Sequence, residues 1–225
     1  MAPTTRDQTP RSVVDHNAIK HSSLTHNRSP TRKGQLRRQQ ILDAAAYCFE
    51  SMGYRTASMA AIAERAETTK ANVYHYFKSK HDLLFALHSG WIDDLFESFQ
   101  HATEELDADP TLMIRQVFRD VLSLIDARPN QMRSYFEYFR ELPADLQAEA
   151  RAKRTAYQNA VEAYITQGIE EGRFTAQSSR VATFGMFGMC QWAYQWYRPG
   201  GDHLGPEAIA DQLFDIFING LSSDK

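Results

Sequence analysis

Apolar residues recur every three or four positions along most of the chain from residue 35 onward, which is the spacing of helices that bury one face. The first such helix is predicted to end at Gly53, because glycine commonly follows the last turn of a helix. Its buried stripe is predicted to consist of Ile41, Ala45, Cys48, Phe49 and Met52. Two short helices are predicted over 58–66 and 69–77, with the hydroxyl groups of Ser58 and Thr69 as N-caps.

A third hydroxyl, that of Ser79, begins a long predicted helix that ends near Pro110. The remaining helices are predicted over about 111–127, 130–141, 145–171, 178–197 and 206–221. Alternating runs typical of strands are absent, so the predicted fold class is all-α. Residues 1–30 are polar and are predicted to be a disordered basic tail, because they cannot bury enough apolar surface to offset chain entropy. A small helical domain is predicted over 31–80 and a larger one over 81–225.

Charge divides the chain at the same place. Residues 1–80 carry a net charge of +7 and residues 81–225 a net charge of −10, which indicates a polyanionic partner for the first part. Chance clustering with a basic tail is the alternative. Cys48 and Cys190 have no CxxC partner, which argues against a disulfide framework or a structural zinc site. No apolar run has the length of a membrane span or a signal peptide, so we expect no membrane association and a cytoplasmic location.

The segment 56–80 is predicted to form a short helix, a tight turn and a second short helix, the layout of a helix-turn-helix. Val73 and Phe77 are predicted to point inward from the second helix. Its outer face and flanks are predicted to carry Ala71, Asn72, Tyr74, His75 and Lys78. Small residues allow close approach to the major groove, an asparagine amide can pair with base edges, and lysine or tyrosine can hold phosphates. A DNA-binding role follows, with an ordinary helical hairpin as the alternative.

Many positions in this region agree, in order, with one known family. They are Ile41–Ala45, Phe49, Gly53-Tyr54, Ile62-Ala63, Ala66, Val73–Phe77, Ser79-Lys80 and Leu83-Leu84. Over about residues 35–90 the chain resembles the TetR family of regulators. The resemblance implies a three-helix DNA-binding unit, a long connecting helix and a double-stranded DNA operator as partner. The DNA contacts that it implies are Thr69, Lys70, Ala71, Asn72, Tyr74, His75 and Lys80, with Thr56, Ser58, Arg37 and Arg38 at the phosphate backbone.

The turn departs from the family at Glu67, where members usually carry glycine. If this position has a positive φ, glutamate costs about 1 kcal/mol relative to glycine. Its carboxylate is also expected to repel phosphates. The departure concerns the geometry of the turn rather than the family resemblance.

The C-terminal part contains an unusual segment, Phe184–Gly201, with Gly185 and Gly188 inside a predicted helix. Each helical glycine lowers helix propensity by about 1 kcal/mol relative to alanine, so close helix contact or room for a ligand is expected there. Together with Gln167–Phe174, this segment resembles a TetR subgroup of regulators of fatty-acid, aromatic-acid and steroid breakdown. Members of that subgroup are often released from DNA by acyl-CoA thioesters.

The resemblance further implies a homodimer whose interface is a four-helix arrangement of helices about 178–197 and 206–221. A ligand cavity is predicted to be lined by Trp91, Tyr135, Tyr138, Phe139, Tyr157, Met189, Trp192 and Trp196. Ordinary helix-packing core is the alternative for each of them. Arg151, Lys153 and Arg154 form a basic cluster that is a candidate for CoA phosphates, with a solvated helix face as the alternative.

The predicted function is a TetR-type DNA-binding regulator, expected to be a repressor, which a small effector releases from a palindromic operator. An acyl-CoA or a related lipid or aromatic-acid thioester is the candidate effector. The alternatives are an efflux or stress regulator that senses drugs or other hydrophobic compounds, and a helix-turn-helix adaptor without a ligand. Sequence motifs for a nucleophilic serine, a zinc hydrolase or a phosphate-binding loop are absent, so no enzyme activity, cofactor or metal is expected.

Overall fold

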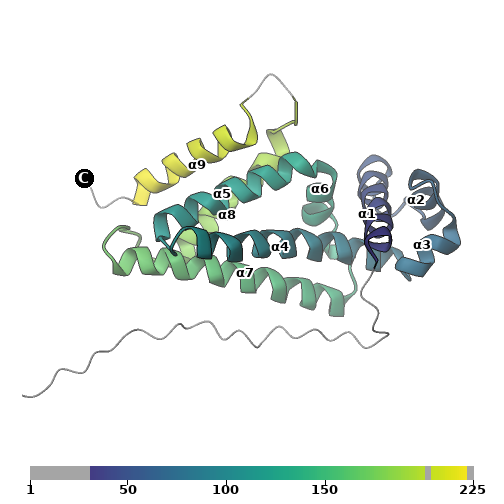
Figure 1. The fold of residues 1–225 in the computed structure, drawn as a ribbon, viewed down its shortest axis with the longest axis horizontal. Helices are drawn as coiled ribbons and strands as arrows, with labels where there is room; N and C mark the ends of the chain where they lie inside the picture. Colours follow the sequence, from purple (N-terminus) through teal and green to yellow (C-terminus); the bar gives the residue numbers. More distant parts are fainter. Residues whose placement is uncertain (1–30, 201–203, 222–225) are drawn as a thin grey trace, which may run out of the picture.

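The computed structural model describes residues 31–200 and 204–221 of the chain, and within these ranges the backbone is helical with no strand. The elements are α1 (Arg32–Met52), α2 (Met59–Arg65), α3 (Lys70–Tyr76), α4 (Lys80–Glu105), α5 (Pro110–Ala127), α6 (Pro129–Glu137), the 3-10 turn η1 (Phe139–Glu141), α7 (Ala144–Glu170), α8 (Ser179–Trp196) and α9 (Pro206–Leu221) (Figure 1). The all-α prediction is confirmed. The predicted disordered tail, residues 1–30, lies outside the described residues.

Helices α1, α2 and α3 form a small unit at one end of the molecule, which we call the head (Figure 1). Ser58, Thr69 and Ser79 are the N-caps of α2, α3 and α4, and each side chain accepts a hydrogen bond from the backbone N–H three residues ahead. The core of the head includes Ile41, Leu42, Phe49, Ile62, Val73 and Phe77, together with Leu83, Leu84 and Leu87 from α4. The core therefore continues past residue 80 into the long connecting helix.

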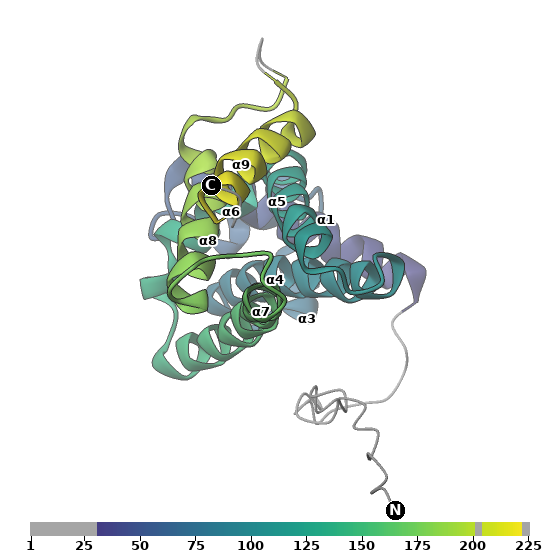
Figure 2. The same cartoon turned by 90° about the vertical axis from the view of Figure 1, so that its left-hand side faces the viewer.

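The larger unit, which we call the body, consists of α4, α5, α7, α8 and α9 (Figure 2). Its core includes Trp91, Leu95, Phe99, Ile114, Phe118, Leu122, Val161, Ile165, Phe187 and Phe214. Helix α9 packs against α5, where Arg115 and Arg119 both donate through Nε to Asp211 Oδ1, at 3.0 and 2.9 Å. Asp211 has its pKa lowered to about 2, chiefly by these hydrogen bonds. The ion pairs fix α9 in register on α5.

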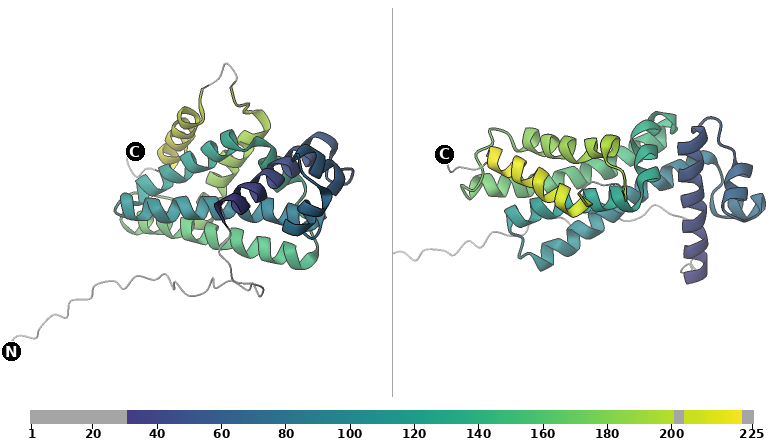
Figure 3. Two further views of the ribbon diagram at one scale, coloured as in Figure 1. Left: turned by 45° about the vertical axis from the view of Figure 1, so that its right-hand side comes forward. Right: turned by 90° about the horizontal axis from the view of Figure 1, so that it is seen from above.

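Helix α6 and η1 lie between the two units and contact both, so we call them the joint (Figure 3). The Tyr138 hydroxyl donates to the Phe49 carbonyl oxygen of α1 at 3.0 Å, and Arg55 pairs with Glu141 at 3.0 Å. Tyr135, on the same short helix, lies in the core of the body. The sequence predicted one helix over 130–141, but the backbone leaves the α-helical pattern at Tyr138 and continues as a 3-10 turn.

The other predicted helices agree with the structure to within a few residues at each end. The turn between α4 and α5 is made without glycine, since Asp107 and Ala108 have φ of 49° and 54°. None of the described helices combines the length and apolar character needed to span a bilayer.

Candidate nucleic-acid interface and effector cavity

Helix α3 has the form expected of a recognition helix. Val73 is fully buried and Phe77, just past its end, is 4% exposed, so these two side chains anchor the helix to the head. Ala71, Tyr74 and His75 are exposed on the opposite side. The exposed face of α3 therefore does not contribute side chains to the head core.

The turn before α3 has a positive φ at Glu67, which is the condition under which glutamate is costly at this position. Glu67 has φ of 49°. Its backbone N–H donates to the Glu64 carbonyl, and the N–H of Thr68 donates to the carbonyl of Ala63 at 2.9 Å, so α2 ends in a tight hydrogen-bonded turn. A non-glycine residue in this conformation carries a steric cost between Cβ and the following carbonyl. Glu67 therefore stores local strain in the turn.

Asn72 is positioned by this turn. Its side-chain Nδ2 donates to Thr68 Oγ1 at 2.8 Å, and its backbone N–H donates to Thr69 Oγ1 at 3.1 Å. An amide group has two donor hydrogens and an acceptor oxygen, so the bond to Thr68 uses one donor and fixes the orientation of the group. The remaining capacity of Asn72 is held in a defined direction at the N-terminal end of α3.

Lys80, which the sequence predicts to contact DNA, makes contacts inside the head. Its Nζ donates to the backbone carbonyls of Tyr54 at 2.6 Å, Ala57 at 2.9 Å and Arg55 at 3.1 Å. The ammonium group also lies 4.5 Å from the centre of the Tyr54 ring, and burial lowers its pKa. An ammonium group has three donor hydrogens, so the three carbonyls use all of them. In this arrangement Lys80 closes the connection between α1 and α2 and offers no donor to a phosphate.

The two arginines predicted on α1 also make contacts within the head. Arg37 donates to the carbonyl of Ala66 at 3.3 Å, and the Arg38 guanidinium lies 5.0 Å from the centre of the Phe77 ring. Burial lowers the pKa of Arg38. Each guanidinium has five N–H donors, so these contacts leave donors for phosphates.

The remaining predicted contacts are exposed or serve as caps. Thr56, Ser58 and Thr69 are exposed, and the last two cap α2 and α3. Lys70 is exposed, with its Nζ 5.9 Å from the centre of the Tyr74 ring. Arg65, the last residue of α2, is an exposed basic residue that the sequence prediction did not include, and its guanidinium lies 4.3 Å from the centre of the Tyr47 ring. Its position in the last turn of α2, close to the start of α3, was the sequence feature that could have indicated it.

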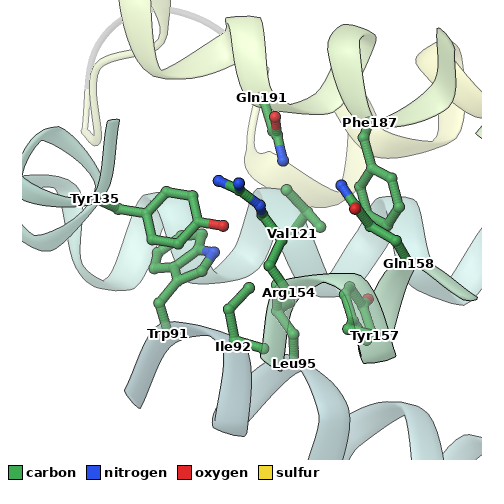
Figure 4. A pocket seen from close by; sticks show the side chains of 10 residues that line it. All are labelled: Trp91, Ile92, Leu95, Val121, Tyr135, Arg154, Tyr157, Gln158, Phe187 and Gln191. Atoms are coloured by element: carbon green, nitrogen blue, oxygen red, sulfur yellow. The ribbon is translucent and has the colours of Figure 1, made fainter. Parts of the chain in front are cut away.

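A chamber lies inside the body between α4, α5, α7 and α8 (Figure 4). Its lining consists of Trp91, Ile92, Leu95, Val121, Tyr135, Arg154, Tyr157, Gln158, Phe187 and Gln191. Three of the predicted ligand residues, Trp91, Tyr135 and Tyr157, meet in this lining. Its volume is about 10 Å³, which is close to the least space that holds one water molecule. Side chains must move before an organic ligand enters.

A wider cleft opens outside the chamber. One part, of about 350 Å³, is lined by Tyr135, Phe136, Arg151, Arg154, Thr155, Gln158, Arg180, Phe184 and Gln191. An adjoining part, of about 390 Å³, is lined by Tyr135, Phe136, Glu137, Phe139, Arg140 and Arg154. Because Tyr135, Arg154, Gln158 and Gln191 line both the chamber and the cleft, the two spaces meet at these side chains.

The other predicted ligand residues lie elsewhere. Tyr138 packs against the head core and Phe139 lines only the outer cleft. Met189 is half-buried against the body core. Trp192 and Trp196 are 65% and 47% exposed, so the prediction that they line the chamber is wrong for the chain as described. They lie on the side of α8 that faces away from Phe187 and Gln191, the two residues of this helix that line the chamber.

The predicted basic cluster on α7 is split between two sides of the helix. The Lys153 Nζ pairs with Asp93 of α4 at 2.8 Å and lines none of the three spaces. Arg151 and Arg154 turn to the cleft, with guanidinium carbons 5.2 and 5.4 Å from the centre of the Phe139 ring. Sequence reasoning missed Gln158, although its position one turn after Arg154 places it on the same face.

Several buried polar atoms in the body and joint have no hydrogen-bond partner among the described residues. They are Tyr135 Oη, Tyr157 Oη, His88 Nε2, Ser89 Oγ and Asp120 Oδ2. His88, at 3% exposure, contacts the Tyr135 ring at 4.9 Å between centres, and burial lowers its pKa to about 4. Burial also raises the pKa of Tyr157. Buried polar atoms are normally paired, so these groups mark a region with spare hydrogen-bonding capacity.

The outer face of α8 is apolar and exposed. Val181 is 71% exposed and Trp192 65%, and a Cβ added at Gly185 or Gly188 would meet open space. Ile216 of α9 is also 65% exposed. Exposed apolar side chains that share one helix face are typical of an interface with another protein chain.

A helix-turn-helix head joined to a helical body that contains a cavity defines the class of ligand-responsive DNA-binding regulators. Residues 41–87 match the model of bacterial regulatory proteins of the tetR family, and residues 107–221 match the tetracyclin repressor-like C-terminal domain. The second match covers about half of the chain, and the chain belongs to the TetR family.

Individual relatives have low sequence identity to the chain. The chain is 27% identical over 190 residues to the HTH-type transcriptional repressor KstR2 of Rhodococcus jostii, covering 83% of this chain and 92% of that protein. It is similar to the structure of AibR in complex with isovaleryl coenzyme A and operator DNA, with 27% identity and a TM-score of 0.70 over 80% of this chain and 97% of the other. The structure of KstR2 of Mycobacterium tuberculosis shares the fold, with 24% identity and a TM-score of 0.75 over 84% and 96%.

Proposed function

We propose that the protein is a homodimeric repressor that binds a palindromic operator and is released from it by an acyl-CoA thioester. The observation that carries the choice of effector is the arrangement of the cavity. An aromatic chamber opens into a cleft whose lining includes Arg140, Arg151, Arg154 and Arg180. An acyl group is apolar and the CoA part carries several phosphate charges, so the two halves of a thioester match the two halves of the cavity.

The DNA face of the proposal is the exposed side of α3 with its flanks. Thr69, Lys70, Ala71, Asn72, Tyr74 and His75 are the proposed contacts of α3, with Thr56, Ser58, Arg37 and Arg38 at phosphates. Two α3 helices of a dimer would enter successive major grooves, about 34–36 Å apart. We retain the division into a DNA-binding domain over 31–80 and an effector and dimer domain over 81–225, with α4 shared between their cores.

The dimer is proposed to form through the exposed faces of α8 and α9. Trp192, Trp196 and Ile216 would be buried there, and the open space at Gly185 and Gly188 would let the partner helix approach closely. This assignment also gives the two tryptophans a role that the chamber does not.

Release is proposed to act through the joint. Tyr135 lines the chamber, while Tyr138, three residues further along, donates to Phe49 of α1. An effector that enlarges the chamber must displace Tyr135, and this displacement shifts the hydrogen bond to the head. The effector then favours a state with a different head spacing and lowers the population that can bind DNA.

AibR, whose structure holds both isovaleryl coenzyme A and operator DNA, supports the binding of an acyl-CoA by similarity. The proposal is tested by gel-shift titration on an operator selected from random DNA, followed by addition of acyl-CoAs, the matching free acids or cationic dyes. Release by a CoA thioester, with an increase in melting temperature, is expected. Release by dyes alone would favour an efflux or stress regulator, and DNA binding that no ligand changes would favour an adaptor.

A further inference from the structure

The side chain of Arg154 occupies the place where the chamber meets the outer cleft. Together with Tyr135 it lines all three of the spaces described above. Figure 4 shows its guanidinium between the Tyr135 ring and the Gln191 amide, above the apolar chamber walls. Gln158, one helical turn further along α7, lines the same junction. We call this junction the neck.

Three neighbouring basic side chains of the body are paired with carboxylates, whereas Arg154 is not, and Arg151 of the same cleft donates to the Gln147 amide oxygen instead. Lys153 pairs with Asp93 at 2.8 Å, and Arg180 pairs with Glu162 at 3.2 Å. Arg128 pairs with Asp94. Among the described side chains no carboxylate lies within ion-pair distance of Arg154, whose guanidinium carbon lies 5.4 Å from the centre of the Phe139 ring. The acid of the cleft lining is Glu137, which is exposed at the outer rim.

The rest of the neck consists of hydrogen-bonding groups that face the same space. The Tyr135 hydroxyl is buried without a hydrogen bond of standard geometry, and it faces the Arg154 guanidinium, whose charge opposes the rise in the Tyr135 pKa that burial causes. The amides of Gln158 and Gln191 add donors. Placing a guanidinium against apolar walls has a desolvation cost that a bound anion would offset. A cation without a counter-ion, surrounded by donors at the mouth of an apolar chamber, is a site for one acidic group of an amphiphilic ligand.

We infer that the neck is an anion subsite in which Arg154, aided by Tyr135, Gln158 and Gln191, binds an acidic group of the effector while the apolar part enters the chamber. The acidic group is a phosphate of a CoA thioester or the carboxylate of a free acid, since both offer the same oxygen geometry to a guanidinium. This inference rests on the proposed function only in taking the chamber as the effector site.

The test compares one acyl group in three chemical forms. Octanoyl-CoA carries phosphates, octanoate carries a carboxylate, and the N-acetylcysteamine thioester of octanoate carries no charge; an isovaleryl set covers a smaller acyl group. Dissociation constants are measured by calorimetry for the wild type, for Arg154→Met and for Lys153→Met. The control changes the adjacent lysine, which pairs with Asp93 and lines none of the spaces.

The expected result is that wild type binds at least one charged form at least tenfold more tightly than the neutral thioester. Arg154→Met should weaken that charged form by roughly 10- to 100-fold and leave the neutral form unchanged, as loss of a charge-assisted hydrogen bond predicts. Lys153→Met should change none of the three constants. If the CoA form alone responds, the anion is a phosphate; if octanoate responds, it is a carboxylate.

Equal binding of a charged form by wild type and Arg154→Met would overturn the inference, as would a preference for the neutral thioester or no binding of either charged form. Melting temperature and operator binding of each variant without ligand show that it is folded. The two proposals fail separately. A protein that binds operator and is released by a dye, but binds no charged acyl form, lacks the anion subsite and remains a regulator. Arg154-dependent binding in a protein without an operator contradicts only the proposed function.

Discussion

The head and the body differ in how completely their buried polar atoms are hydrogen-bonded. In the head, Lys80 donates to three backbone carbonyls, Ser58 and Thr69 cap their helices, and Asn72 is bonded to Thr68. The Tyr54 hydroxyl is the exception in the head, since it is buried without a partner among the described residues. In the body and joint, five buried polar atoms make no hydrogen bond among the described residues: His88 Nε2, Ser89 Oγ, Asp120 Oδ2, Tyr135 Oη and Tyr157 Oη.

This difference follows from what each unit has to bind. A DNA-reading surface needs side chains held in fixed directions, because base edges and phosphates have fixed geometry. A chamber that admits a ligand contains polar groups that are not paired within the protein, and burying unpaired polar groups lowers stability. Removing a hydrogen-bonded polar group should therefore destabilise the head, whereas removing an unpaired buried polar group should be neutral or stabilising in the body.

The largest expected effect concerns His88. Its folded pKa is about 4, lowered from 6.5 chiefly by burial, while the hydrogen bond with the Ser134 backbone raises it and Arg154 lowers it. Below pH 6.5 the unfolded chain takes up a proton that the folded chain refuses until about pH 4, so stability should fall across this window. The full loss is roughly 3 kcal/mol at pH 4. Urea denaturation at several pH values between 7 and 4 measures it.

His88→Gln is the control, because glutamine keeps hydrogen-bonding groups without titrating in this range. The variant should show a flatter dependence of unfolding free energy on pH between 6.5 and 4 than the wild type. Identical curves for the two proteins would mean that His88 does not carry this dependence. Carboxylates such as Asp211, whose pKa is about 2, lose their contribution at lower pH in both proteins and do not affect the comparison.

Lys80 gives the next largest effect. Lys80→Met leaves three carbonyls of the α1–α2 connection without their donor, so we expect the free energy of unfolding to fall by roughly 2 kcal/mol. Operator affinity should fall only as far as the head unfolds, and the slope of log affinity against log salt should stay the same. If Lys80 instead neutralised a phosphate of the operator, its replacement would reduce that slope by about 0.9.

Lys70→Met is the matched variant, since Lys70 is an exposed lysine on α3. It should reduce the salt slope with little change in stability. If Lys80→Met reduced the salt slope as Lys70→Met does, the DNA contact that the sequence predicts for Lys80 would be confirmed. The carbonyl contacts would then belong only to the unbound protein.

Lys80 and Trp192 show where sequence reasoning reached its limit. The period of apolar residues and the hydroxyl caps were enough to predict the helices and most of the head core, because both are local signals. Met52 is the exception, since it was predicted in the buried stripe of the first helix but is 46% exposed. The hydrogen-bond partners of a polar side chain depend on which distant segments of the chain the fold brings beside it. Nothing near Lys80 in sequence indicates that the carbonyls of 54–57 lie around its ammonium group, some 25 residues away. Trp192 was placed in the chamber because it is aromatic, but its position on α8 turns it outward.

The cavity was predictable only in part. Aromatic richness indicated Trp91, Tyr135 and Tyr157, which do meet in the chamber. The basic cluster on α7 did not indicate that Lys153 pairs with Asp93 while Arg154 stays without a carboxylate, because that outcome depends on α4 lying beside α7. Long-range packing decides which member of a cluster is free to bind a ligand.

Tyr157→Phe tests the body side of the comparison with a smaller change. The Tyr157 side chain is 1% exposed and its hydroxyl has no partner among the described residues. Removing the hydroxyl should raise the free energy of unfolding by roughly 1 kcal/mol, because an unsatisfied polar atom leaves the core. Thermal denaturation measures the change. A loss of stability of similar size would mean that an ordered water pairs with the hydroxyl, and the contrast between body and head would then weaken.

Glu67→Gly is the smallest of the expected changes, and it tests whether backbone strain at Glu67 affects stability and operator binding. Glu67 has φ of 49°, so glycine at this position removes a steric cost and should raise the free energy of unfolding by about 1 kcal/mol. Glu67→Gln retains the side chain and its strain but removes the charge. If the carboxylate repels phosphates, both variants should bind operator more tightly at low salt, and the difference should shrink as salt screens the charge. If only Glu67→Gly binds more tightly, the turn geometry limits affinity. If neither does, the strained turn has no part in operator binding and Glu67 affects stability alone.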